Sequence, residues 1–227
     1  MRLLLIRHGQ TPSNVTGAID TAHPGAPLTP LGEAQARAVP VALDGVRVDA
    51  VHASTLVRTQ LTAAPLVEAR GAALEVHDGF REISAGTLEM RTDEEAVRSY
   101  ATCVAAWMWG DLDRTMPGGS TGHEFLERYD AAMDAALEGH GDDATVVVVS
   151  HGAAIRVWTT HIARMDPAVT TELRMPNTGM VVLDGAPGRG WVVEQWPTEP
   201  LGGARLEDRR AHDVTAESAE EAVEEAG

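Results

Sequence analysis

The sequence predicts an α/β fold: a three-layer sandwich with a mostly parallel central sheet flanked by helices, plus a small helical cap. Short apolar runs alternate with helical patterns along the chain, which is typical of βαβ units. The run Val146–Val149 consists only of β-branched residues, as in a strand covered on both faces. Two later apolar runs, joined by a glycine-containing turn, predict a hairpin at the edge of this sheet.

The expected strands are apolar runs that end at turn residues. They cover residues 1–6, 48–53, 73–76, 145–150, 180–183 and 191–196. Residues 12–30 are rich in Pro, Thr, Gly and Ala and show no periodicity. This segment is therefore expected to be a loop that lies over the functional site.

The expected helices lie between these strands. They begin at Thr29, at Ser54 or Thr55, near Thr92, at Gly122 and at Ala153, and the last four end near residues 69, 111, 137 and 164. The first has the clearest start signals, because Thr29 suits an N-cap, Pro30 the first helical position and Glu33 the first turn.

The domain organisation follows from where the strand pattern stops. We expect an α/β domain over residues 1–203, with a cap inserted at about 83–121. Four large apolar residues lie in or beside this cap, either anchoring it to the domain or forming an apolar wall for a substrate: Trp107, Met108, Trp109 and Met116. Residues 204–227 contain eight acidic residues, three arginines and no aromatic residue, which predicts a flexible acidic tail.

Composition narrows the functional classes. The chain has 227 residues, a net charge of −16 and no lysine, since all 18 basic residues are Arg. A P-loop lysine and a Schiff-base lysine are therefore excluded, and nucleic acid and anionic membranes are disfavoured as partners. The single Cys103 cannot form an internal disulfide, and no apolar run is long enough to span a membrane. We therefore expect a cytoplasmic protein.

Two strands end in a histidine followed by glycine. Leu3–Ile6 leads to Arg7, His8 and Gly9, and the run 145–150 leads to His151 and Gly152. If these strands are parallel neighbours, both histidines lie at the edge of the sheet where ligands bind in α/β folds. An arginine beside an imidazole suits a phosphate group, because the arginine binds its oxygens and the imidazole can attack phosphorus or donate a proton.

Six sequence blocks follow one another in a recognisable order. They are Arg7–Thr11, Leu28–Ala36, Ser54–Arg58 with Thr62 and Ala63, Phe80–Ile83 with Gly86 and Glu89, Pro117–Gly119, and Ser150–Gly152. In these blocks the chain resembles the histidine phosphatase superfamily, the phosphoglycerate-mutase-like proteins. Ser120 and Met90 depart from the residues that the family often has there, glutamate and glycine, which affects expected substrate contacts. No His-Asp pair follows the second strand, so the acid-phosphatase and phytase branch is disfavoured.

The resemblance implies a phosphohistidine mechanism with His8 as the nucleophile. Arg7 and Arg58 would bind phosphate oxygens, while His151 would stabilise the transition state as an imidazolium or a neutral donor. Glu82 would protonate the leaving group and later activate water; otherwise it would form a solvated pair with Arg81. Three further residues are candidate phosphate ligands: Gln10, Asn14 and Gly152.

The expected function is hydrolysis of a phosphomonoester, with a small phosphorylated metabolite as substrate. A phosphoglycerate-type mutase and a non-catalytic phospho-ligand-binding protein are the alternatives. We expect no metal ion or other cofactor, because no His-x-x-x-His, cysteine cluster or carboxylate pair supports one. The sequence leaves open whether the chain forms a homodimer. The remaining histidines are expected to be structural or surface residues: His23, His52, His77, His123, His140, His161 and His212.

Overall fold

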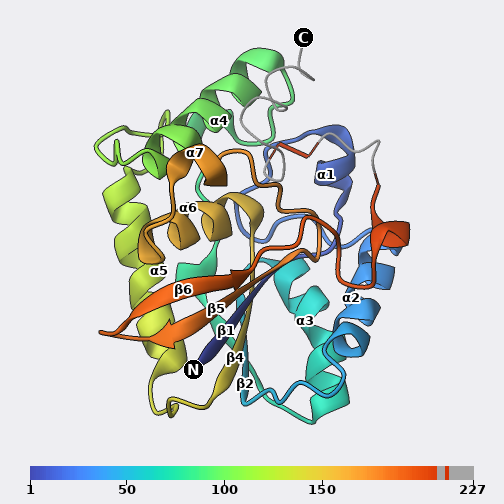
Figure 1. Cartoon of the computed structure of the whole chain (residues 1–227). Helices are drawn as coiled ribbons and strands as arrows, with labels where there is room; N and C mark the ends of the chain where they lie inside the picture. The colour runs from blue at the N-terminus through green and yellow to red at the C-terminus, as the bar shows by residue number, and fades with distance from the viewer. Residues whose placement is uncertain (209–212, 215–227) are drawn as a thin grey trace.

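The computed structural model describes residues 1–208, 213 and 214, and a six-stranded sheet runs through its centre (Figure 1). The strands are β1 (Arg2–Arg7), β2 (Ala50–Ser54), β3 (Leu74–His77), β4 (Thr145–Ser150), β5 (Met180–Ala186) and β6 (Gly190–Gln195). Their order in the sheet is β3-β2-β4-β1-β5-β6. The first four in this order pair in parallel, whereas β5 and β6 form an antiparallel hairpin at one edge. The predicted mostly parallel sheet with an edge hairpin is confirmed.

Helices cover both faces of the sheet (Figure 1). On one face lie α2 (Pro30–Ala42) and α3 (Val57–Arg70), and on the other α5 (Gly122–Leu137) and α6 (Gly152–Ile162). Helix α4 (Glu94–Met108) packs against α6. The shorter elements are α1 (Pro12–Thr16), α7 (Pro167–Thr170) and the 3-10 turns η1 (Asp78–Phe80), η2 (Gly86–Leu88) and η3 (Ala204–Leu206). The three-layer prediction is therefore confirmed.

The sheet separates two hydrophobic cores, and successive side chains of β1 enter them alternately. Leu3 and Leu5 pack into the core under α4, α5 and α6, whereas Leu4 and Ile6 pack into the core under α2 and α3. All four are at most 1% exposed. Because both faces of the strand are buried, apolar residues occupy successive positions instead of alternating with polar ones.

The start of α2 follows the predicted signals. The Thr29 side chain accepts a hydrogen bond from the Gly32 amide, Pro30 is the first helical residue, and Glu33 lies in the first turn. This helix start lies against the segment after β1. A Cβ on Gly9 would lie 2.6 Å from the Gly32 carbonyl oxygen, so the glycine after His8 is required by this close approach.

Two sequence predictions are wrong in detail. The expected loop at 12–30 contains the short helix α1, which begins with a capping box between Thr11 and Asn14. Five residues are too few to show helical periodicity. Neither Ser54 nor Thr55 caps α3; its N-cap is Leu56, which makes no side-chain capping bond. The hydroxyl of Ser54 instead bonds His151, and the hydroxyl of Thr55 bonds Asp78.

The segment expected to form a cap contains η2 and α4. Trp107, Met108 and Met116 are buried in the core shared with α5 and α6, whereas Trp109 is 61% exposed. The indole of Trp107 stacks on Phe125 and donates a hydrogen bond to the Arg114 carbonyl. These contacts support the interpretation of the buried residues as anchors; the domain boundaries stay a prediction.

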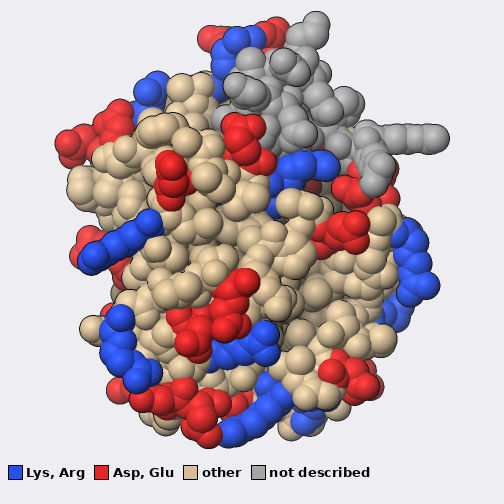
Figure 2. Space-filling view, viewed as in Figure 1, with Lys and Arg blue, Asp and Glu red and all other residues tan. Residues whose placement is uncertain are grey.

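Charged side chains of both signs are interspersed on the face shown in Figure 2. Within the described part of the chain, no helix combines the length and apolar character needed to cross a membrane. Part of the expected flexible tail contacts the domain: Leu206 accepts a hydrogen bond from the Gln35 side chain, and Asp213 pairs with Arg7. Residues 209–212 and 215–227 of this tail lie outside the described residues.

Candidate active site

The two predicted histidines lie side by side at the end of neighbouring strands. Strands β1 and β4 are parallel, and Arg7 pairs in register with Ser150. His8 and His151 therefore follow at the same level, with ring centroids 5.2 Å apart and planes inclined by 60°. The exposed fractions are 2% for His8 and 0% for His151. The geometry expected from two strands ending in His-Gly is present.

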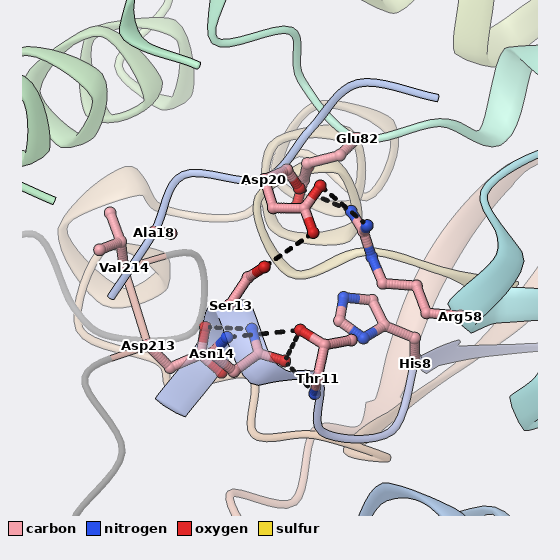
Figure 3. Close-up of a pocket in the computed structure, with 10 residues that line it drawn as sticks. All are labelled: His8, Thr11, Ser13, Asn14, Ala18, Asp20, Arg58, Glu82, Asp213 and Val214. Carbon is pink, nitrogen blue, oxygen red and sulfur yellow. Dashed lines mark hydrogen bonds and ion pairs between the residues drawn. The ribbon is translucent and has the colours of Figure 1, made fainter. Parts of the chain in front are cut away.

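A small pocket opens in front of His8 (Figure 3). It is lined by His8, Thr11, Ser13, Asn14, Ala18, Asp20, Arg58, Glu82, Asp213 and Val214. Four predicted site residues are thus in its wall. Arg7 and His151 are wholly buried and are linked to it through Asp213 and His8, respectively. None of the large apolar residues of the expected cap lines this pocket.

His8 is held in one tautomer and as a neutral ring. Its Nδ1 lies 2.8 Å from the Gly9 carbonyl oxygen, so Nδ1 carries the hydrogen and Nε2 keeps its lone pair. Burial lowers the pKa of His8 well below its usual value, and the positive charges of Arg58 and Arg7 lower it further. A neutral imidazole with a free lone pair is the form required of a nucleophile.

Arg58 extends from the first turn of α3 into the pocket. Its Nη2 donates to the Asp20 backbone carbonyl at 2.8 Å, and Nη1 lies 3.6 Å from the Asp20 carboxylate. Among the described residues, Nε and Nη1 have no hydrogen-bond partner although both are buried. These donors could bind the oxygens of an anion. Thr62 ties the helix to the first strand, because its hydroxyl donates to the Arg58 carbonyl and accepts from the Gly9 amide.

Arg7 is fully buried beneath the pocket. Its Nη1 donates to the Met175 carbonyl at 2.8 Å, and its Nη2 pairs with the Asp213 carboxylate at 2.6 Å. The same carboxylate accepts a hydrogen bond from the Asn14 side-chain amide at 3.0 Å. A carboxylate of the C-terminal segment thus contacts two residues that the sequence assigned to phosphate binding.

His151 makes one side-chain hydrogen bond within the described structure. Its Nε2 lies 2.8 Å from the Ser54 hydroxyl, while Nδ1 is buried without a partner among the described residues. Burial, then the charge of Arg58, lowers the pKa of His151 well below its usual value. Of the two forms that the sequence left open, this environment favours the neutral donor over the imidazolium.

Glu82 is a buried carboxyl group, 3% exposed, rather than a solvated partner of Arg81, which pairs with Asp78 instead. Its Oε1 accepts hydrogen bonds from the Ile83 and Ala154 amides, and its Oε2 accepts one from the Ala153 amide at 3.2 Å. Burial raises the pKa of Glu82 and outweighs these hydrogen bonds and the nearby arginines, which lower it. A raised pKa suits a general acid.

The other predicted phosphate ligands are placed differently. Asn14 lines the pocket, and its Oδ1 accepts from the Thr11 amide. The Gln10 side chain is directed elsewhere, because it accepts from the Thr29 hydroxyl and donates to Asp208. Gly152 is the first residue of α6 and does not line the pocket. The structure therefore does not bring Gln10 or Gly152 to the pocket.

Several residues of the site had no assigned role in the sequence interpretation. Ser54 is the last residue of β2 and bonds His151, so its place at a strand end was an available signal. Asp20 lies in irregular chain and binds both Arg58 and the Ser13 hydroxyl. Asp213 is 206 residues from Arg7 in the sequence. No local pattern marks either aspartate.

Comparison with known proteins agrees with this geometry. The sequence model of the histidine phosphatase superfamily (branch 1) matches residues 3–198. The chain belongs to this superfamily. A PE-PGRS family protein of Mycobacterium tuberculosis, PE_PGRS11, is 35% identical over 88% of this chain, which spans 37% of that relative. The probable phosphoglycerate mutase GpmB of Erwinia tasmaniensis is 28% identical, over 92% of this chain and 96% of its own length.

Solved structures of phosphatases have a similar fold. A mycobacterial glucosyl-3-phosphoglycerate phosphatase complexed with VO3 has a TM-score of 0.73 at 25% identity, covering 86% of this chain and 98% of that one. The α-ribazole phosphatase of Shigella flexneri has a TM-score of 0.69 at 26% identity, with coverages of 86% and 96%. A phosphoserine phosphatase of Entamoeba histolytica, in complex with 3-phosphoglyceric acid, has a TM-score of 0.69 at 28% identity, with coverages of 88% and 98%.

Proposed function

We propose that the protein is a phosphoric monoester hydrolase that acts on a small phosphorylated metabolite through a phosphohistidine intermediate. The observation that carries the proposal is that the imidazole of His8, the guanidinium of Arg58 and the carboxyl group of Glu82 line one pocket. The pKa of His8 is lowered and that of Glu82 is raised, both chiefly by burial. These directions favour a neutral nucleophile and a protonated acid, the two forms that phosphoryl transfer to histidine requires.

The first chemical step transfers the phosphoryl group to His8. The Nε2 lone pair attacks phosphorus while the bond from phosphorus to the ester oxygen breaks. Glu82 gives its proton to that oxygen, so the alcohol leaves neutral and Glu82 becomes a carboxylate. Arg7 and Arg58 compensate the negative charge of the phosphoryl oxygens, and His151 donates a hydrogen bond to them.

The second step releases phosphate. The Glu82 carboxylate removes a proton from a water molecule as the water oxygen attacks phosphorus, and the bond from phosphorus to Nε2 breaks. Inorganic phosphate, neutral His8 and protonated Glu82 result, so the cycle is closed in atoms and charge. Because the two arginines supply positive charge, we expect turnover to persist in the presence of EDTA.

A mutase is the second candidate, favoured by the similarity to proteins named probable phosphoglycerate mutases. Such a reaction requires cationic groups for a substrate carboxylate in addition to those for the phosphate. Arg58 is the only arginine that lines the described pocket, and two aspartates, Asp20 and Asp213, share its wall. This charge distribution supports hydrolysis of esters without an adjacent carboxylate.

The decisive experiment measures products and the intermediate together. The chain is incubated with a panel of phosphorylated metabolites that includes 3-phosphoglycerate, and free phosphate and isomeric products are quantified. A ³²P-labelled substrate should give an acid-labile, alkali-stable label on His8. Isomerisation without phosphate release would establish the mutase. Phosphate binding without turnover of any substrate would indicate a non-catalytic phospho-ligand-binding protein.

A further inference from the structure

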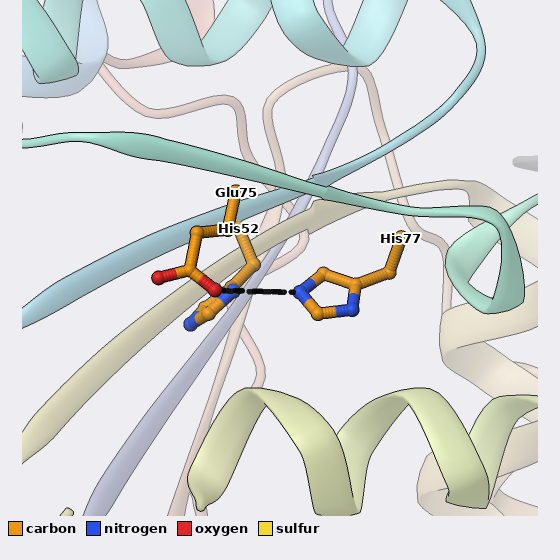
Figure 4. Close-up of side chains that lie close together, drawn as sticks. All are labelled: His52, Glu75 and His77. Atoms are coloured by element: carbon orange, nitrogen blue, oxygen red, sulfur yellow. Dashed lines mark hydrogen bonds and ion pairs between the residues drawn. The ribbon is translucent and has the colours of Figure 1, made fainter.

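Three side chains with metal-ligating atoms meet on the face of β2 and β3 that lies against α5, away from the pocket (Figure 4). His52 on β2 is in register with Glu75 on β3, and His77 follows Glu75 by two residues. Successive side chains of a strand alternate between faces, so this spacing puts all three on one face. One ligand atom from each residue lies within 4.8 Å of the other two.

The distances match those in a metal site. His52 Nδ1 lies 3.1 Å from His77 Nε2, and Glu75 Oε2 lies 3.9 Å and 4.0 Å from these two atoms. In a tetrahedral zinc site with bonds of about 2.0–2.1 Å, neighbouring ligand atoms are roughly 3.3 Å apart. The two imidazoles already have this spacing, and the Glu75 oxygen needs to move inward by only a fraction of an ångström. The Glu75 side chain is 65% exposed, which allows this movement.

We propose that His52, Glu75 and His77 form a binding site for a divalent transition metal ion, with Zn²⁺ as the preferred ion. Two imidazole nitrogens and one carboxylate oxygen are a known ligand set for zinc, and imidazole also suits nickel and copper. The His52 side chain is 2% exposed and that of His77 is 19% exposed. Two buried or half-buried ligands and one exposed carboxylate leave room for a water molecule at the fourth position.

The protonation states are compatible with metal binding. Burial, followed by the neighbouring His77, lowers the pKa of His52 to about 4. Without metal, one ring donates its hydrogen to the lone pair of the other. With metal, His52 carries its hydrogen on Nε2 and His77 on Nδ1, so one ring changes tautomer and no proton is released. The ionised Glu75 then reduces the local charge from +2 to +1.

The ion would have a structural role. It would tie β3, an edge strand of the sheet, to its inner neighbour β2. β3 leads directly into η1, which is followed by Glu82, and β2 ends at Ser54, which bonds His151. Metal binding would therefore stabilise the corner of the sheet from which two elements of the pocket extend. This inference does not depend on the proposed function.

The test is calorimetric titration of the full, chelator-treated chain with ZnCl₂, followed by thermal unfolding. We expect one ion per chain and a melting temperature raised by roughly 5 °C or more when the zinc concentration is 100 times the Kd. Glu75→Gln and His77→Ala should each weaken binding by at least about tenfold. The matched control is His123→Ala, because His123 is exposed and forms a surface ion pair with Asp113.

His8→Ala separates this site from the pocket. Unchanged zinc affinity in His8→Ala and His123→Ala, with affinity at least about tenfold weaker in Glu75→Gln, supports the proposal. Loss in His8→Ala with full binding in His77→Ala would overturn it, since the ion would then belong to the pocket. Absence of saturable binding up to millimolar zinc would also overturn it. Glu75→Gln keeps the side-chain shape at an exposed position, so the result does not depend on whether His77→Ala folds.

Discussion

Two histidine pairs in the same sheet have nearly the same ring geometry and opposite electrostatic surroundings. The ring centroids of His8 and His151 are 5.2 Å apart at 60°, and those of His52 and His77 are 5.1 Å apart at 54°. Burial lowers the pKa of His8, His151 and His52. The arginines lower the pKa of the first pair further, whereas the Glu75 carboxylate opposes the lowering at His52, whose pKa is still about 4. The charges around a pair, rather than the pair itself, therefore decide whether it suits an anion or a cation.

The hydrogen-bond partners of the ring nitrogens also differ between the two pairs. In the first pair the Gly9 carbonyl and the Ser54 hydroxyl each hold one ring nitrogen, so the rings do not bond each other. In the second pair Nδ1 of His52 and Nε2 of His77 face one another directly. The first arrangement leaves separate nitrogens for attack and donation, and the second directs two ring nitrogens toward one point.

The largest expected effect is that of His8→Ala. Removal of the only proposed nucleophile should lower kcat by roughly 10⁴-fold or more, the scale seen when a covalent nucleophile is lost. The ³²P label should disappear as well. His123→Ala is the control for changing an exposed histidine. Normal turnover in His8→Ala, or label on His151, would contradict the distinction between the two pairs.

Glu82→Gln should have the next largest effect. The leaving group of an alkyl phosphate is a strongly basic alkoxide, which needs a proton. Loss of the acid should therefore slow the burst phase with this substrate by on the order of 10²–10⁴-fold. The leaving group of p-nitrophenyl phosphate needs no protonation, so the burst rate with this substrate should fall much less. Single-turnover measurements are needed, because slow dephosphorylation would make steady-state rates of both esters fall alike. If Glu82→Gln lowers the burst rates with the two esters equally, Glu82 has a positioning role instead.

The pH profile of the alkyl-phosphate burst tests the same residue. The lowered pKa of His8 keeps the ring neutral, so activity should fall on the acid side only well below pH 6.5. The pKa of Glu82 is raised, and its protonated form is the reactive one, so the rate should fall as pH rises through that pKa. Glu82→Gln should remove this alkaline decline. A decline unchanged in the variant would assign it to the substrate phosphate or another group.

The sequence predicted those parts of the fold that depend on local patterns. Helix α5 runs from Gly122 to Leu137, the bounds expected from the sequence, and His8 and His151 follow neighbouring parallel strands. The site residues that the sequence did not show are held by long-range contacts. Ser54 and His151 are 97 residues apart in the chain, and no periodicity reports which strand ends become neighbours through tertiary packing.

The metal-ligand cluster of His52, Glu75 and His77 was not predicted from the sequence, for a related reason. A search for His-x-x-x-His or cysteine pairs assumes that ligands lie close in the sequence. Here Glu75 and His77 are adjacent positions on one face of β3, but His52 comes from the neighbouring strand, and only the register of β2 with β3 brings it opposite Glu75. Strand register is set by packing of the whole sheet and cannot be read from either strand alone.

Ser54→Ala should show the importance of the hydroxyl that distinguishes the first pair. If Ser54 donates to Nε2 of His151, then Nδ1 carries the hydrogen that a bound phosphate would accept. Loss of the hydroxyl leaves a buried nitrogen unpaired, and kcat should fall roughly 10- to 100-fold with a smaller change in KM. The ¹⁵N chemical shifts of His151 should report a changed tautomer population. Thr55→Ala is the neighbouring control, and unchanged His151 shifts would leave Ser54 a purely structural residue.

The smallest expected effect concerns Asp213, whose carboxylate lines the pocket in front of the first pair. It pairs with Arg7 at 2.6 Å and accepts from Asn14 at 3.0 Å, so a phosphate that uses these donors must displace it. Asp213→Asn removes the competing charge and keeps the side-chain shape. The inhibition constant of inorganic phosphate should therefore fall by about 3- to 10-fold, with kcat nearly unchanged.

The control for Asp213→Asn is Asp142→Asn, since Asp142 forms an exposed ion pair with Arg189. The comparison of Asp213→Asn with the wild type should also be made at high salt. Screening should weaken phosphate binding in both proteins, but the buried Arg7–Asp213 pair is screened less than an exposed pair. The difference in phosphate affinity between the two proteins should therefore persist at high ionic strength. Weaker phosphate binding in Asp213→Asn would reverse the interpretation. Asp213 would then hold Arg7 in place for the substrate instead of competing with it, and the acidic segment would belong to the catalytic pocket.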